Sequence, residues 1–198
     1  MRPDNGDLKE FQQIQQLYNE AERFIKEVEV VEAAVAFPAI NQLRYAGHHL
    51  LKALVSEARE DFQTELNDIR DHCHRAMYEA AEAGIGYLLE LFTTFETDFK
   101  DIIVTDTVSD YSEIRALRQA AASELYKGRV DRSSPVEQVR HYMNRYRELK
   151  QGVDKLEASR SELNKVKMRE VKSSRRFVYQ VLFWISVVLI GIAGLILR

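Results

Sequence analysis

The chain has 198 residues, of which 45% are hydrophobic and 30% charged, and its formal net charge is −3. These values fit one globular domain of roughly 100–200 residues, and 8 Gly with 3 Pro exclude collagen-like and Pro-rich linker proteins. A single Cys excludes a disulfide scaffold and a Cys-based zinc site, and the near-neutral charge gives no general argument for nucleic-acid binding.

The first two predicted helices are separated by Phe37-Pro38, because proline suits the first turn of a helix and ends the one before it. From about Asp7, apolar residues recur at helical spacing: Phe11, Ile14, Leu17, Ala21, Phe24, Ile25, Val28, Val31 and Val35. A second helix is expected over 39–54, ending near Ser56 to Glu60. One of its faces carries Ile40, Leu43, Gly47, Leu50, Leu51 and Leu54.

Three further helices follow, and no segment has the alternating pattern of a strand. A long third helix is expected over 62–99, and the turn-rich segment 101–110 separates it from a fourth that begins at Asp110, with Glu113 as capping partner, and ends near Gly128. Ser134-Pro135-Val136-Glu137 combines a cap, a first-turn proline and a capping-box Glu, so a fifth helix is expected to begin there. Its seam Val139, Tyr146, Leu149, Val153, Leu156 and Leu163 favours a helix packed on the bundle for its first half over a short coiled coil. The sequence therefore predicts an all-α, helical-bundle fold.

Charge is distributed unevenly along the chain. Residues 137–176 hold twelve Lys or Arg and six Asp or Glu, a net charge of +6. Because Arg198 adds one positive charge to a total of −3, residues 1–136 carry −10. We therefore expect an acidic bundle over 1–130, a basic stalk helix over 131–176 and a third segment over 177–198.

The third segment contains 21 residues without a charge, from Phe177 through Trp184, Gly191 and Gly194 to Leu197. A helix of this length is about 31 Å long, close to the thickness of a bilayer core, and it predicts a C-terminal transmembrane helix that acts as a tail anchor. The basic residues before it, which include Lys172, Arg175 and Arg176, predict contact with anionic lipid and a cytoplasmic head, with the bacterial inner membrane as the expected location. The small residues of the run permit close helix contact and favour a homo-oligomer.

Four of the five His residues lie in two short clusters, His48-His49 and His72/His74. If the second and third helices are antiparallel, a flank with Asn41, Arg44, His48 and Lys52 could meet a flank with Glu65, Asp68, His72 and Glu79. Imidazole and carboxylate groups are acceptable metal ligands. Adjacent histidines diverge by about 100° on a helix, however, and no His-x3-His pair is present, so no metal and no cofactor are expected.

The segment R44-Y-A-G-H-H49, with Arg and His separated by four residues in an all-helical chain, resembles the HEPN superfamily over about residues 8–130. The resemblance implies metal-independent RNA cleavage in a cleft between two protomers. It assigns Arg44 to the charge that develops on the phosphate and His49 to proton transfer. The two polar flanks described above add Asn41, Asp68 and His72 as a supporting polar cluster. Tyr45 departs from the small polar residue usual after the Arg, and His48 offers an alternative to His49.

Three functions follow as expectations. The first is a membrane-anchored, self-associating HEPN-like effector of bacterial defence or toxin activity, with RNA as substrate. The second is a non-catalytic adaptor whose acidic head binds a protein partner. The third is an oligomeric membrane-perturbing or pore protein. Whether the chain is an enzyme depends on Arg44 and His49.

Overall fold

A computed structural model describes the backbone of residues 5–32, 36–130 and 136–196 and the side chains of residues 6–31, 36–127, 138–172 and 176–186. Throughout these ranges the regular structure is helical, without a strand. The elements are α1 (Asn5–Glu32), α2 (Phe37–Val55), α3 (Arg59–Asp98), the 3-10 turn η1 (Val104–Asp106), α4 (Tyr111–Val130) and α5 (Val136–Ile196). The all-α prediction is confirmed, and the helices begin and end within a few residues of the expected positions. The expected cap Ser134-Pro135 and the side chain of Glu137 lie outside the described residues, and α4 continues through Gly128 to Val130.

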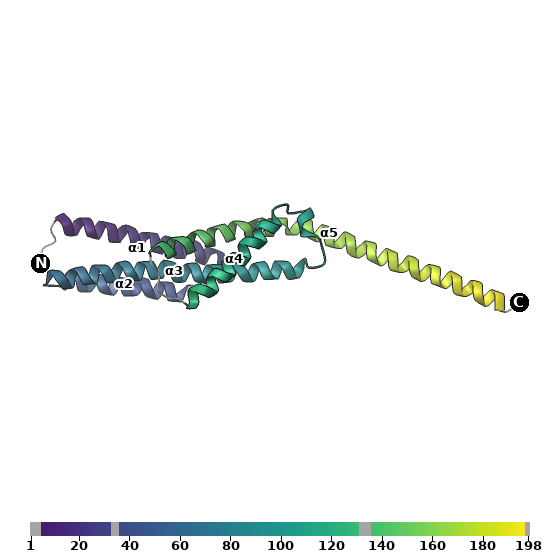
Figure 1. Ribbon diagram of the computed structural model, residues 1–198, viewed down its shortest axis with the longest axis horizontal. Coiled ribbons are helices and arrows are strands. Elements are labelled where there is room, and N and C mark those ends of the chain that lie inside the picture. The colour runs from purple at the N-terminus through teal and green to yellow at the C-terminus, as the bar shows by residue number, and fades with distance from the viewer. Residues whose placement is uncertain (1–4, 33–35, 131–135, 197–198) are drawn as a thin grey trace.

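The centre of the bundle is α3, the 40-residue helix against which α1, α2, α4 and α5 all pack. Figure 1 shows α1 and α2 alongside α3, with α4 crossing obliquely and α5 running out beyond the bundle. Apolar side chains repeat along α3 at helical spacing and are buried from Phe62 to Phe95. The only cysteine of the chain, Cys73, lies in this core, where burial raises the pKa of its thiol to about 12. Cys73 therefore stays protonated and is excluded as a nucleophile.

Small residues bring α2 and α3 together. The side of α2 that faces the core carries Ala39, Ala46 and Ala53, each at most 2% exposed, with Leu43 between them. Alanine lets two helices approach closely because its side chain ends at Cβ. Three larger apolar residues of α2, Ile40, Leu51 and Leu54, point outward and are 39%, 64% and 60% exposed.

The first half of α5 is part of the bundle. Tyr146, Leu149, Leu156 and Leu163 are at most 1% exposed, and the ring of Tyr146 meets Phe24 of α1 edge to face at 5.7 Å. The packing there is tight, because a Cβ built on Gly84 of α3 would lie 2.6 Å from Tyr146 Cε2. Near the end of this packed half, Lys167 Nζ donates to the carbonyl oxygen of Asp98 at 2.6 Å.

Ion pairs join α5 to its neighbours. Arg145 donates from Nε and Nη2 to both oxygens of Glu124 on α4, at 3.0 and 2.9 Å, and Arg147 binds both oxygens of Glu27 on α1, at 3.1 and 2.9 Å. Burial by itself would raise the pKa of Glu124, but the hydrogen bonds and charges of Arg145 and His141 together outweigh it and lower the pKa of this carboxyl. These two bidentate pairs fix the orientation of α5 against α1 and α4.

The prediction of a transmembrane tail anchor is wrong for the chain as described. Among the residues that the structure describes, no helix combines the length and the apolar character needed to cross a bilayer. Within the run that suggested a span, the structure describes the side chains of residues 177–186. The predicted location, a single-pass protein of the bacterial inner membrane with a cytoplasmic head, depended on that span and is wrong for the same reason.

The residues chosen for the span and its flank lie on α5 beyond the bundle. Phe177 and Trp184 are 65% and 66% exposed, and Lys172 and Arg176 are exposed as well. The other three residues, Arg175, Gly191 and Gly194, belong to parts of α5 whose side chains lie outside the described residues.

Candidate functional site

A cluster of polar side chains lies between α2 and α3. Its residues from α2 are three and four positions apart, so they share one side of that helix. Gln42, Tyr45 and His49 lie on one side of α2, beside the buried alanine row. From α3, Glu65, Asp68, His72 and Glu79 point toward them. We call these residues the α2–α3 polar cluster.

A histidine held by two carboxylates forms one end of the cluster. His49 Nδ1 donates to Glu65 Oε2 at 2.6 Å and lies 3.4 Å from Asp68 Oδ2. Lys52 Nζ is 3.9 Å from the other oxygen of Glu65. The side chains of His49 and Glu65 are each 18% exposed, so the pair is accessible from solvent but mostly covered. The carboxylates fix the ring, and its Nε2 has no hydrogen-bond partner within the described part of the chain.

A second histidine lies against the first. The rings of His49 and His72 stack at 5.1 Å with 27° between their planes. His72 Nδ1 donates to Gln42 Oε1 at 2.7 Å, and Gln42 Nε2 donates to Glu79 Oε1 at 2.9 Å. Burial is the main cause that lowers the pKa of His72, and the neighbouring charge of His49 lowers it further. His72 is therefore neutral at pH 7 and packs against His49 without a charge of its own.

The other residues expected at the site are placed differently. Arg44 is exposed and its guanidinium lies 5.1 Å from the centre of the Tyr45 ring. Tyr45 in turn lies 5.5 Å from the His72 ring, so Arg44 reaches the cluster only through Tyr45. Asn41 and His48 are also exposed, on the outward side of α2.

The structure therefore brings together His49, Asp68 and His72, and it separates Arg44 and Asn41 from them. Four members of the cluster were not named as site residues: Gln42, Tyr45, Glu65 and Glu79. Glu65 and Glu79 were nevertheless placed on the flank of the third helix that was expected to face the second. Glu65 had a usable signal in the sequence, because it lies three residues before Asp68 and thus on the same face of the helix. Gln42 had none, because its role depends on the register between α2 and α3.

The cluster also contains the donor atoms of a metal site. One atom each from His49, Glu65 and Asp68 lies within 4.8 Å of the other two. An imidazole nitrogen with two carboxylate oxygens is a donor set of divalent transition metals. From the sequence, no metal was expected because the histidines do not form a suitable pair. The combination of one histidine with Glu65 and Asp68 was not weighed there.

His74 lies apart from the cluster, in a cavity of about 300 Å³ between α1, α3 and α5 that is also lined by Glu20, Met77, Arg140 and Arg147. Burial is the main cause that lowers the pKa of His74, although Asp71 and Glu20 oppose it.

The lowered pKa of His74 predicts a pH effect on stability. In the unfolded chain, His74 takes up a proton below its pKa of about 6.5, whereas in the folded chain it does so only at a lower pH. The stability contributed by neutral His74 is therefore present above about pH 6.5 and is lost as the pH falls through the folded pKa. We expect His74→Gln to reduce the loss of unfolding free energy between about pH 7.5 and about pH 5.5, measured by urea unfolding. An equal loss in both proteins would contradict this assignment.

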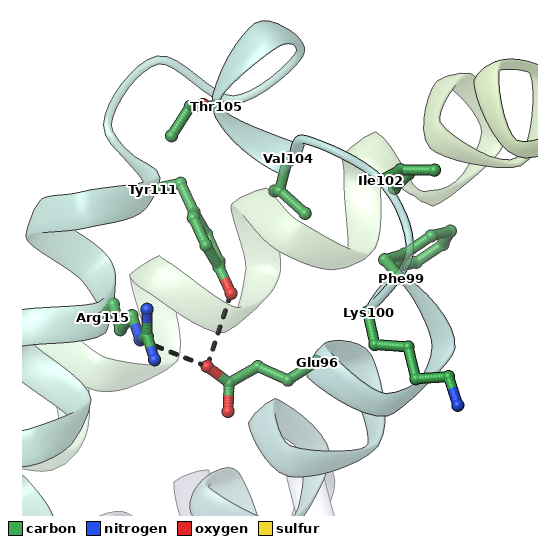
Figure 2. Close-up of a pocket in the computed structure, with 8 residues that line it drawn as sticks. All are labelled: Glu96, Phe99, Lys100, Ile102, Val104, Thr105, Tyr111 and Arg115. Carbon is green, nitrogen blue, oxygen red and sulfur yellow. Dashed lines mark hydrogen bonds and ion pairs between the residues drawn. The ribbon is translucent and has the colours of Figure 1, made fainter.

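A further pocket, of about 440 Å³, lies where α3 gives way to the loop that contains η1. Figure 2 shows Glu96 pointing toward Tyr111 and Arg115 of α4, with Lys100 directed away from them. The Tyr111 hydroxyl and Arg115 Nε lie 3.4 and 3.5 Å from the same Glu96 oxygen. This carboxylate therefore ties α4 to α3, and its charge is balanced within the pocket.

Comparison with known proteins gives no matching family model, no matching curated protein and no matching solved structure. The HEPN resemblance therefore stays a prediction, and the argument about function depends on the geometry of this chain.

Proposed function

We propose that this protein is a self-associating interaction protein whose bundle pairs through the outer face of α2. The observation that supports this proposal is a row of exposed apolar residues on a well-formed helix. Ile40, Leu51 and Leu54 belong to it, and Phe37 and Val55 at its two ends are 70% and 77% exposed. Contiguous apolar surface of this kind typically marks a site of protein association.

The row has the spacing of a second helix-packing seam. Ile40, Arg44, Gly47, Leu51 and Leu54 follow one another at intervals of four, three, four and three residues. An alternating spacing of three and four residues is typical of a helix face that packs against another helix. The buried row of α2 has the same spacing. Thus α2 has two packing faces, and the bundle occupies only one.

The centre of the row is shaped for close approach. No described atom lies within 4 Å of a Cβ built on Gly47, so this position is open. An antiparallel pair of α2 helices centred on Gly47 would place Ile40 of each copy against Leu54 of the other, which is the self-complementary arrangement that a two-fold dimer requires.

An apolar groove continues the same surface. A cavity of about 500 Å³ between α1 and α2 is lined by Leu8, Phe11, Ile14, Leu50 and Gly47, and no residue that lines it is charged. Leu8 at its edge is 52% exposed. The groove enlarges the apolar area that a second copy would cover.

The test is the mass of the full chain by light scattering over a concentration series. We expect a dimer or larger species for the wild type and a smaller one for the double variant Leu51→Asp/Leu54→Asp, because burying two carboxylates at the contact is strongly unfavourable. Val30→Asp is the matched control, since Val30 is an apolar residue of α1 with 83% exposure outside the row. Both variants keep α5 unchanged, so any association through α5 is common to them. A monomeric wild type, or a mass that the double variant leaves unchanged, would contradict the proposal.

RNA cleavage is a second candidate, favoured by the fixed ring of His49. A carboxylate on Nδ1 with Nε2 left available is the arrangement of an imidazole that transfers protons. Arg44 belongs to the exposed row of α2, so pairing would bring it to the contact between two copies. This candidate is an enzyme, whereas the self-association proposed above requires no catalysis.

A further inference from the structure

We propose that His49, Glu65 and Asp68 bind a divalent transition-metal ion. This inference goes beyond self-association and does not depend on it. It stands on the positions of three donor atoms, on the helices that carry them and on the groups around them.

Two of the three distances between the donor atoms are close to those of a coordination shell, and the third is at most 4.8 Å. Ligands that share one ion at about 2.0–2.2 Å lie roughly 3.0–3.5 Å from one another. His49 Nδ1 lies 3.4 Å from Asp68 Oδ2, and its 2.6 Å hydrogen bond to Glu65 Oε2 would need to open by only several tenths of an ångström. The proton now between His49 and Glu65 would leave when the ion binds.

The scaffold of the site is rigid. Glu65 and Asp68 lie three residues apart on α3, so their side chains project from the same face. His49 comes from α2, whose buried alanine row holds it close to α3 along its length. Helices joined in this way keep donor atoms in place better than loops do.

The surroundings suit a cation. Glu65 and Asp68 contribute two negative charges and Lys52, 3.9 Å from Glu65, one positive charge, so the site keeps a net negative charge when His49 is neutral. The ring of His72 stacks on His49, and Gln42 and Glu79 fix His72 through hydrogen bonds. Such outer partners hold a ligand ring in orientation.

The donor set selects the class of ion. Imidazole nitrogen favours zinc, copper, nickel, cobalt and iron over calcium and magnesium, which prefer oxygen ligands. The side chain of Asp68 is 44% exposed, so solvent can supply the remaining ligands. The expected occupant is therefore a first-row transition-metal ion with coordinated water.

The test uses the full chain, stripped with a chelator and titrated with zinc by calorimetry and with cobalt by visible absorption. We expect one saturable site per chain and a rise in the melting temperature on binding. Asp68→Asn should weaken binding by about 10-fold or more, because an amide oxygen carries no charge and is a poorer ligand than a carboxylate. Asp71→Asn is the matched control, since Asp71 is an exposed aspartate one helical turn further along α3.

His49→Gln provides a second variant and should abolish the cobalt absorption bands while circular dichroism shows an unchanged helix content. Because Asp68 is partly exposed, its variant should fold even if that of His49 does not. The absence of zinc or cobalt binding by the wild type would overturn the proposal. Binding that Asp68→Asn leaves at wild-type strength would also overturn it, since the ion would then be held elsewhere, for example by His141 and Glu124.

Discussion

Replacing Gly84 with alanine is expected to lower the free energy of unfolding by about 1–3 kcal/mol. The added Cβ would lie 2.6 Å from Cε2 of Tyr146 and 3.0 Å from Cγ1 of Val28. The ring of Tyr146 is fully buried, and its hydroxyl donates to the carbonyl oxygen of Glu27 at 3.4 Å, so it cannot move aside without disturbing α1. This overlap outweighs the gain of about 1 kcal/mol that alanine brings to a helix interior.

Gly86 provides the matched control for Gly84. It lies two residues later on α3, and no described atom is within 4 Å of a Cβ built there. Gly86→Ala should therefore gain helix propensity without strain and raise the free energy of unfolding by up to about 1 kcal/mol. Urea unfolding followed by circular dichroism measures both changes. A Gly84→Ala protein as stable as the wild type would show that α3 and α5 are less closely packed than described.

If the chain cleaves RNA, Arg44→Ala and His49→Ala should each lower the rate by about 10²–10⁴-fold. The cation stabilises charge on the phosphate and the imidazole moves the proton, so neither group replaces the other. The measurement is cleavage of a labelled RNA by the full chain, with a chelator present, because this chemistry needs no metal. Loss of toxicity on expression provides a second readout.

His48→Ala and His74→Ala are the controls for this prediction. His48 is exposed on the outward side of α2, and His74 lies in a separate cavity, so both variants should cleave RNA at nearly the wild-type rate. Activity lost with His48→Ala and kept with His49→Ala would reject the assignment taken from the family resemblance. Activity kept in the Arg44, His48 and His49 variants would reject catalysis at this site.

The helices themselves could be predicted because their boundaries depend on local chemistry. Pro38 separates α1 from α2, and the polar segment 101–110 separates α3 from α4, as expected. The burial of α5 from Val139 to Leu163 could also be read from its apolar spacing.

The orientation of α2 could not be predicted in the same way. The sequence suggested a core face centred on Ile40, Gly47 and Leu54, whereas the buried face is centred on Ala39, Ala46 and Ala53. Adjacent residues on a helix differ by about 100°, so this is a rotation of roughly 100° about the helix axis. Large apolar residues are the stronger signal in a sequence, but a close helix contact prefers small ones. The rotation moves Arg44 to the outer face and brings His49 toward α3.

The partners of His49 depended on tertiary register. Its distance to Glu65 follows from how far α2 slides along α3, which the turn between them and the fit of the alanine row decide together. Neither is encoded by spacing within one helix. The sequence could thus group the acidic residues of α3 on one face. It could not predict which side chain of α2 they would bind.

The unbroken course of α5 has a mechanical consequence. Its 61 residues make a rod of about 90 Å, and about 45 Å of it lies beyond Lys167, which hydrogen-bonds to the bundle at Asp98. A continuous helix resists twisting and bending, and the bidentate pairs of Arg145 and Arg147 clamp its base. If two copies pair through α2, a change in the tilt between their bundles would therefore move the far end of each α5. A small change of angle at α2 becomes a displacement of many ångströms at the C-terminal end of α5.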